Sequence, residues 1–233
     1  INPRFDLYWR DFSQAHLVKV RENLQAGKDI QNGVANSVNS AKTATDLNSK
    51  NVANWSVRGF TYQSLAGILG GAEDWAIRSY DEAIKLEPAN PYFSTQKGIM
   101  TLRKAILSQD SAEKEKFFAQ AQEQFEKAIE LKSDYAPAHF QIAILYQAEG
   151  KISQAITKLE ETKNLAPFDI GLAFQLGVAY YQDKNYQKAK EELERAVSLD
   201  SNYANALYFL GLTYDELGER GKALEKFRKV AEL

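Results

Sequence analysis

Cysteine is absent from the 233 residues of this chain, and histidine occurs only twice. The lack of cysteine excludes disulfides, thiolate metal sites and cysteine nucleophiles, and it leaves the redox compartment undetermined. His16 and His139 lie far apart in the sequence, and neither stands in a metal-ligand spacing. We therefore expect packing roles for both, with His139 between helices and His16 on the interior face of its helix.

Long apolar runs and an excess of one charge are also lacking. No stretch approaches the roughly 18 apolar residues of a membrane-spanning helix, and no signal-peptide pattern opens the chain. Lysine and arginine number 29 against 31 aspartates and glutamates, for a net charge of −2. We expect a soluble chain that does not bind nucleic acid. Because it begins at Ile1 without methionine, we expect a fragment of a longer protein or a processed chain.

Motifs that carry chemistry are missing as well. The only glycine pair is Gly70-Gly71, and nothing matches the phosphate-binding patterns G-x-x-x-x-G-K-[ST] or G-x-G-x-x-G. Carboxylates such as Glu160-Glu161 and Glu191-Glu192 have lysines three or four residues away, which predicts solvated ion-pair faces. We expect no catalytic residue, no cofactor and no metal, and hence no enzyme.

What the chain does contain is a repeat of 34 residues. Ala136, Ile170 and Ala204 open three units at this spacing, and Gly150 and Gly218 stand where the first helix of a unit must end. Within the units, small and aromatic residues recur at fixed offsets, as in Gly177, Tyr180 and Ala189 followed by Gly211, Tyr214 and Ala223. This pattern resembles the tetratricopeptide repeat family. The resemblance implies an all-α fold, a right-handed superhelical α-solenoid of antiparallel helix pairs.

The small residues of the repeat have a steric cause. Two antiparallel helices joined by a short turn approach closely only where both carry small side chains. We therefore expect Gly177 to face Ala189 and Gly211 to face Ala223.

Earlier in the chain the pattern continues with insertions. A unit at 52–90 has five extra residues around Ile68 and Leu69, and a unit at 91–135 has eleven. Eleven residues are close to three turns, so we expect both helices near 91–131 to lengthen by roughly one and a half turns. Ile106 and Leu107 would then meet two aromatic residues across the hairpin, Phe117 and Phe118.

The first fifty residues are less regular. Apolar residues recur at helical spacing and predict a first helix, at positions Phe5, Trp9, Phe12, Val20 and Leu24. We expect a degenerate N-terminal helix pair at 1–51, followed by four units at 52–90, 91–135, 136–169 and 170–203 and a last unit at 204–233. The expected total is five helix pairs.

The family resemblance implies that first helices line a concave groove, with four positions of each unit pointing into it. These positions carry an apolar and aromatic set: Phe60, Tyr92, Ile99, Phe140, Ile144, Phe174, Val178, Tyr181, Tyr208 and Leu212. We expect a non-catalytic scaffold that binds a peptide, a helix, a partner protein or another copy of the chain there. Packing of Phe174 and Ile144 against the adjacent unit is the alternative.

The first third offers a second interpretation. The segments Tyr8-Trp9-Arg10, Asn54-Trp55-Ser56 and Gly71–Ala76 resemble the repeat-bearing tails of bacterial O-antigen-ligase-like membrane proteins. That resemblance implies a soluble accessory tail of a membrane-anchored glycan ligase or polymerase. Its aromatic cluster Phe5, Tyr8, Trp9 and Phe12 would lie near the bilayer surface, or would simply cap the repeats.

Overall fold

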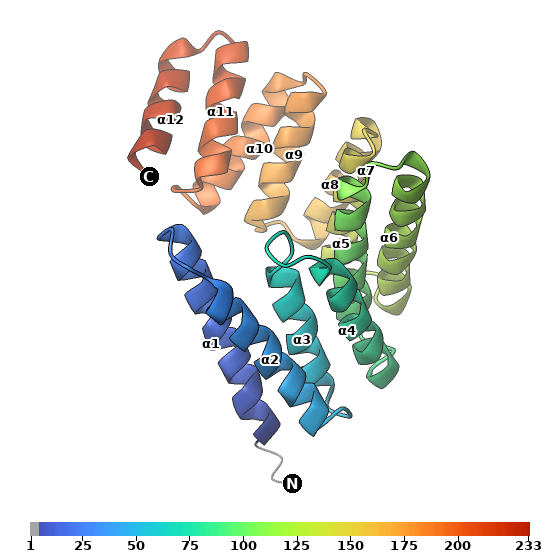
Figure 1. Ribbon diagram of the computed structural model, residues 1–233. Helices are drawn as coiled ribbons and strands as arrows, with labels where there is room; N and C mark the ends of the chain where they lie inside the picture. Colours follow the sequence, from blue (N-terminus) through green and yellow to red (C-terminus); the bar gives the residue numbers. More distant parts are fainter. Residues whose placement is uncertain (1–4) are drawn as a thin grey trace. The chain divides into compact units, whose positions relative to one another are not determined.

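The computed structural model describes residues 5–233, and this part of the chain is built from helices (Figure 1). No strand occurs among the described residues, and twelve α-helices follow one another in sequence. Their bounds are α1 (Phe5–Gln25), α2 (Gln31–Leu47), α3 (Val52–Ser64), α4 (Ala72–Leu86), α5 (Pro91–Leu107), α6 (Ser111–Leu131), α7 (Ala136–Ala148), α8 (Ile152–Leu165), α9 (Ile170–Gln182), α10 (Tyr186–Leu199), α11 (Ala204–Glu216) and α12 (Arg220–Glu232). The expectation of an all-α helical repeat array is confirmed.

The helices form two compact units, residues 1–133 and 134–233. The described part of the first unit holds α1 to α6, and the second holds α7 to α12. Within each unit, successive helices pair off, and each pair packs on the next. The described residues therefore hold six helix pairs, and the expected total of five is wrong. The residue ranges predicted for the N-terminal pair and the later units already added up to six pairs. The division into a degenerate pair and later repeat units stays a prediction.

Helix ends follow local chemistry. Asn51 and Asn90 cap α3 and α5 by accepting hydrogen bonds from backbone N–H groups two residues on, at 3.1 Å in both cases. The turns after α7 and α11 contain Gly150 and Gly218, both with φ of +78°, so the expected left-handed glycines are confirmed. Lys184 occupies the equivalent turn after α9 with φ of +61°, a conformation that costs a side-chain-bearing residue about 1 kcal/mol or more.

In the pairs α9–α10 and α11–α12, close approach depends on glycine, but the partner differs from the expected one. A methyl group built on Gly177 would lie 2.6 Å from the Leu193 side chain, and one on Gly211 would lie 2.5 Å from the Phe227 ring. These neighbours lie one turn beyond Ala189 and Ala223, so the expected facing residues are wrong. A large side chain of the second helix lies across the glycine and fills the space that a Cβ atom would take.

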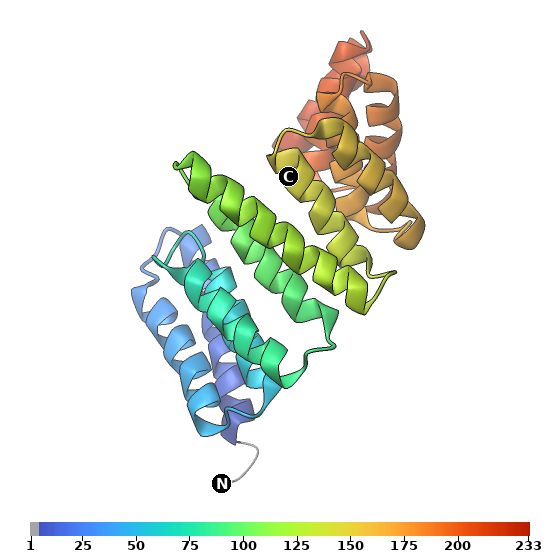
Figure 2. The same cartoon turned by 90° about the vertical axis from the view of Figure 1, so that its right-hand side faces the viewer.

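The insertion at 91–135 lengthens both helices, though unequally. The helix α5 has 17 residues against 13 in α9, and α6 has 21 against 14 in α10, which corresponds to about one and two extra turns. Figure 2 shows this long pair in green, with its helices side by side. Ile106 and Leu107 are more than half exposed, so their expected packing is wrong. Leu102 and Ala105 occupy the inward face of α5 instead.

The N-terminal helix buries only one residue of its predicted apolar pattern, Val20. Phe5, Phe12 and Leu24 are each more than half exposed, whereas the buried positions are Asp6, Ser13 and Val20. His16 is part-buried and lies beside Phe12, with 6.3 Å between the ring centroids, so its expected interior position is wrong. Helical spacing shows that one face is apolar, but it does not show which face a neighbour covers.

The inward face of α1 is held by a buried polar network. The Asp6 carboxylate accepts hydrogen bonds from Asn51 Nδ2 at 2.8 Å and from Asn54 Nδ2 at 3.0 Å. Ser13 donates to the Ser37 carbonyl at 2.9 Å. Burial alone raises the pKa of Asp6, but the hydrogen bonds from Asn54, Asn51 and the Leu7 N–H hold that pKa below its ordinary value of 3.8. The ionised carboxylate therefore ties α1 to α3.

We predict that Gly98→Ala destabilises the fold by about 1–3 kcal/mol, since its methyl group would overlap the fully buried Phe125 ring. Gly221→Ala in α12 is the matched control, because nothing lies within 4 Å of its Cβ position. Urea unfolding of the two variants measures the difference. Equal midpoints would show that the α5–α6 contact does not require glycine.

We predict that Asp6→Asn lowers the free energy of unfolding at pH 7 by about 2 kcal/mol, because an amide would oppose the donors of Asn51 and Asn54. A depressed folded-state pKa contributes stability above the unfolded value and loses it as the pH falls. The gap between the wild type and the variant should therefore narrow from about pH 5 downward. Asp46→Asn, on the exposed face of α2, is the control and should leave stability unchanged. A gap that does not vary with pH would contradict an ionised Asp6.

Candidate functional site

The predicted groove positions of the first unit are partly packed. Phe60 of α3 is 41% exposed, while Tyr92 and Ile99 of α5 are part-buried against a core that includes Tyr80 and Met100. The Tyr92 ring meets Phe93 edge-on with 5.3 Å between centroids. Of the three predicted residues, Phe60 offers the most accessible ring.

Amide and hydroxyl groups lie on the same first helices. Gln63 of α3 donates from Nε2 to Gln96 Oε1 of α5 at 3.0 Å, and it accepts from the Tyr80 hydroxyl at 2.6 Å. Burial raises the pKa of Tyr92, and a hydrogen bond with Ser56 opposes that rise. These polar side chains thus hydrogen-bond to one another across α3, α4 and α5.

The second unit divides its predicted groove residues between core and surface. Phe174 and Val178 of α9 are buried, with only 9% and 8% exposure, so the expected exposure of Phe174 is wrong. Tyr208 of α11 is 47% exposed. The other predicted residues of this unit are part-buried: Phe140, Ile144, Tyr181 and Leu212.

Phe174 is covered by the pair that follows it. Its ring meets Tyr203 edge-on at 5.2 Å and Phe209 at 5.8 Å between centroids. The alternative of packing against the next unit is therefore the correct one for Phe174, although Phe209 lies on a first helix rather than the expected second helix.

Phe209, which the groove positions omit, organises the aromatic surface. Its ring lies 6.0 Å from Tyr181 and 5.9 Å from Tyr208, nearly perpendicular to both. Tyr208 also lies 5.8 Å from Phe227 of α12. Edge-to-face pairs are worth about 0.5–1.5 kcal/mol each beyond buried area, so these contacts restrict the exposed Tyr208 ring. The signal in the sequence that could have identified this residue is its aromatic side chain directly after the predicted groove position 208.

Charged groups near these rings have structural partners. The Tyr214 hydroxyl donates to Glu194 Oε1 at 2.6 Å, and the Tyr180 hydroxyl donates to Glu160. The two pairs occupy equivalent places in successive repeats, and burial followed by the adjacent carboxylate raises the pKa of each tyrosine. A lysine also lies over each ring, Lys188 at 5.0 Å and Lys222 at 5.3 Å. The repeat thus uses these groups to join neighbouring helix pairs.

Metal-ligating clusters are not found in the described part of the chain. No three histidine, aspartate or glutamate side chains converge there as metal ligands. None of the described helices combines the length and apolarity needed to cross a membrane.

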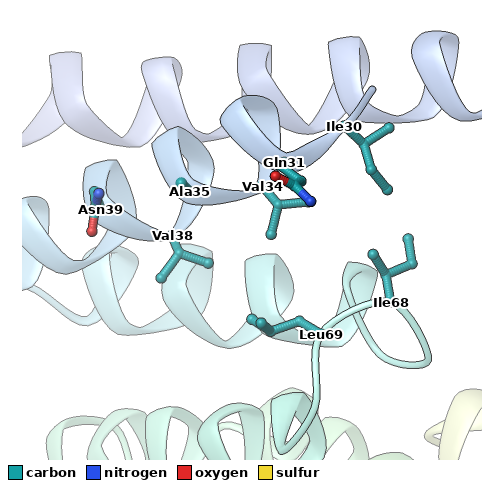
Figure 3. Close-up of a pocket in the computed structure, with 8 residues that line it drawn as sticks. All are labelled: Ile30, Gln31, Val34, Ala35, Val38, Asn39, Ile68 and Leu69. Atoms are coloured by element: carbon teal, nitrogen blue, oxygen red, sulfur yellow. The ribbon is translucent and has the colours of Figure 1, made fainter. Parts of the chain in front are cut away.

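A second hollow, separate from the predicted groove, lies between α2 and the segment 65–71 (Figure 3). Its volume is about 550 Å³, and the side chains around it are Ile30, Gln31, Val34, Ala35, Val38, Asn39, Ile68 and Leu69. The sequence shows both the apolar residues of α2 and the insertion at 68–71, but not that they face each other. The signal in the sequence that could have revealed the hollow is the presence of apolar residues in the insertion.

Comparison with known proteins places the fold. Models of the tetratricopeptide repeat match residues 171–203 and 204–233. Human "Protein O-mannosyl-transferase TMTC3" is 30% identical over 103 residues, which cover 43% of this chain and 11% of that protein. The chain thus spans about a tenth of that relative's length.

Solved structures agree on the architecture. TTC0263, a thermophilic TPR protein from Thermus thermophilus, has a TM-score of 0.65 at 15% identity, over 91% of this chain and 98% of that one. YrrB, described as "a TPR protein with an unusual peptide-binding site", has a TM-score of 0.52 at 19% identity, over 82% and 91%. Residues 171–233 thus carry two recognised tetratricopeptide repeats, and the described chain shares the fold of tetratricopeptide repeat proteins.

Proposed function

We propose that this protein is a non-catalytic interaction scaffold that binds a peptide, a helix or a partner protein on the apolar and aromatic surface of its first helices. The observation that carries the proposal is the exposure of two large rings at predicted groove positions, Phe60 at 41% and Tyr208 at 47%. Neighbouring positions such as Phe174 are covered by the next helix pair. Exposed rings that are rigidly supported are typical anchors for a partner.

The energetics of such binding are adequate. Each well-buried aromatic anchor contributes roughly 1.5 to 3 kcal/mol, so two or three support micromolar binding after the cost of association. Tyr208 loses little conformational freedom on binding, because Phe209 and Phe227 already restrict its ring.

The comparisons with known proteins support a protein or a peptide as the class of partner. Tetratricopeptide proteins are generally non-catalytic scaffolds, and YrrB is described as having a peptide-binding site. We propose a protein or peptide partner, with another copy of this chain as the remaining occupant, and no enzymatic role or cofactor. Nucleic acid is disfavoured, because the net charge is −2 and no basic run occurs.

We predict that Phe60→Ala combined with Tyr208→Ala reduces partner capture from native lysate by about tenfold or more, since truncating an anchor ring costs over 1 kcal/mol. Phe168→Ala is the matched control, because Phe168 is 81% exposed but lies in the turn between α8 and α9, outside the groove positions. Quantitative mass spectrometry of the captured proteins gives the ratio.

Circular dichroism and unfolding midpoints must match those of the wild type in both variants. A sizing measurement at several concentrations separates a second copy from a foreign partner. Unchanged capture by the folded double variant would count against the first-helix surface.

A second candidate function, an accessory tail of a membrane glycan ligase or polymerase, is favoured by the outward face of α1. Phe5, Tyr8 and Phe12 are 54%, 62% and 56% exposed, and Trp9 lies 6.2 Å from Phe12 between ring centroids. Aromatic side chains of this kind collect at bilayer interfaces. The similarity of 103 residues to a protein named as an O-mannosyl-transferase is consistent with a glycan-transferring parent.

The gene that encodes this chain distinguishes the two candidates. For the second candidate we predict that about a dozen apolar segments of membrane-spanning length precede Ile1 in the reading frame. A start codon close to the Ile1 codon would remove this candidate and leave the first unaffected.

A further inference from the structure

The hollow between α2 and segment 65–71 is a built feature rather than a gap between mobile loops. Leu65 is fully buried, and both the Ile68 and Leu69 N–H groups donate to the Leu65 carbonyl at 2.9 Å. Leu69 and Val38 pack against the core formed around Tyr62 and Tyr80. The floor of the hollow is therefore fixed by the folded unit.

The edge of the hollow that segment 65–71 forms, its lip, is also contacted by a residue that does not line the hollow. Arg103 of α5 donates from Nε to Glu73 Oε1 at 2.9 Å, next to the start of α4. The same guanidinium covers Gly67, whose backbone has φ of +88° and whose Cβ position would lie 2.7 Å from Arg103 Nη2. A methyl group at residue 67 would displace that contact. Arg103 therefore contacts the segment at Gly67 while it is paired with Glu73.

The chemistry of the walls selects an uncharged ligand. Six of the eight lining residues are apolar, and the other two carry side-chain amides. Because no charged side chain lines the hollow, an ionised group placed there would lose its hydration without gaining a counter-ion. Figure 3 shows Ile30 facing Ile68 across the hollow, with Val34 and Val38 above Leu69.

The spacing of the walls matches an extended peptide. Ile30, the N-cap residue of α2, is followed at intervals of four residues by Val34 and Val38, which is about 6 Å per step along the helix. In an extended chain, side chains on one side recur about every 6.7 Å. Three alternate side chains of such a chain can therefore seat between the three residues of α2 and the opposite lip.

The two amides supply what an extended backbone needs. Gln31 and Asn39 are exposed, and no hydrogen bond to another described residue involves either side-chain amide. They lie eight residues apart, about 12 Å along the helix, a span of about four extended residues. An extended peptide in an apolar hollow must find partners for its N–H and C=O groups, and an amide both donates and accepts. A helical ligand already pairs its backbone groups internally, and an acyl chain has no such groups, so neither requires these two amides.

We propose that this hollow is a second binding site, which takes an uncharged peptide segment of about five residues in extended conformation, with apolar side chains at alternate positions. The site is formed by a second helix and a turn, so it does not depend on the first-helix surface.

The test uses the full chain and a random heptapeptide library displayed on phage. We expect the enriched sequences to be uncharged, with apolar residues at alternate positions, and the synthetic peptide to bind in calorimetric titration. Ile68→Asp places a carboxylate on the exposed lip and should weaken binding about tenfold or more. Ile106→Asp, at a similarly exposed isoleucine outside the hollow, is the matched control and should bind normally.

Two further measurements separate this proposal from its alternatives. Replacing Gln31 and Asn39 by alanine, or methylating the backbone nitrogens of the peptide, should each weaken binding by about threefold to tenfold. The Phe60→Ala and Tyr208→Ala double variant should bind the peptide as the wild type does, so failure of one site leaves the other testable.

Three results would overturn the proposal. The first is enrichment of peptides that bind the Ile68→Asp and wild-type proteins equally, or of none above background. The second is full competition by decanoate, which would assign the hollow to an acyl chain. The third is a peptide whose binding tolerates backbone methylation but fails when its helix is broken by proline, which would assign the hollow to a helical ligand.

Discussion

The contact on which the rest of this structure depends is the close approach of two helices within a pair. A side chain of the second helix lies across a glycine of the first, as Leu193 does on Gly177 and Phe227 does on Gly211. The N-terminal pair uses the same device with the roles exchanged, since a Cβ atom on Gly33 of α2 would lie 2.7 Å from Val20 of α1. Because the large residue occupies the space between the helices of a pair, the opposite side of the first helix remains free to meet another pair or a ligand.

The sequence predicted the helices and turns better than it predicted which residues pack against one another. The 34-residue period predicted the left-handed turns at Gly150 and Gly218 and the helical character of the array, because these features depend on local spacing. It did not predict that α1 turns Asp6 inward and Phe12 outward. Burial of a carboxylate requires partners from another helix, in this case Asn51 and Asn54, and no local pattern reveals them.

The same limit applies to the candidate site. Phe174 and Tyr208 occupy equivalent positions in successive units, yet one is 9% exposed and the other 47%. Tyr203 and Phe209 of the following pair cover Phe174, whereas Tyr208 lies in the last described helix pair. A position in a repeat therefore does not by itself predict exposure, because the exposure of Phe174 is set by residues of the following pair.

Regular repeats tend to bury their own apolar surface, because each helix pair packs against the next. Accessible apolar surface should then collect where the pattern is interrupted. Two such places are present here: the extra residues at 65–71, which turn the side of α2 into a hollow, and α1, which replaces the usual buried apolar stripe with Asp6 and Ser13. In both, the fold is completed by polar contacts with α3 and α5, and apolar side chains are left at the surface. At these two departures from the 34-residue period, apolar side chains therefore remain accessible.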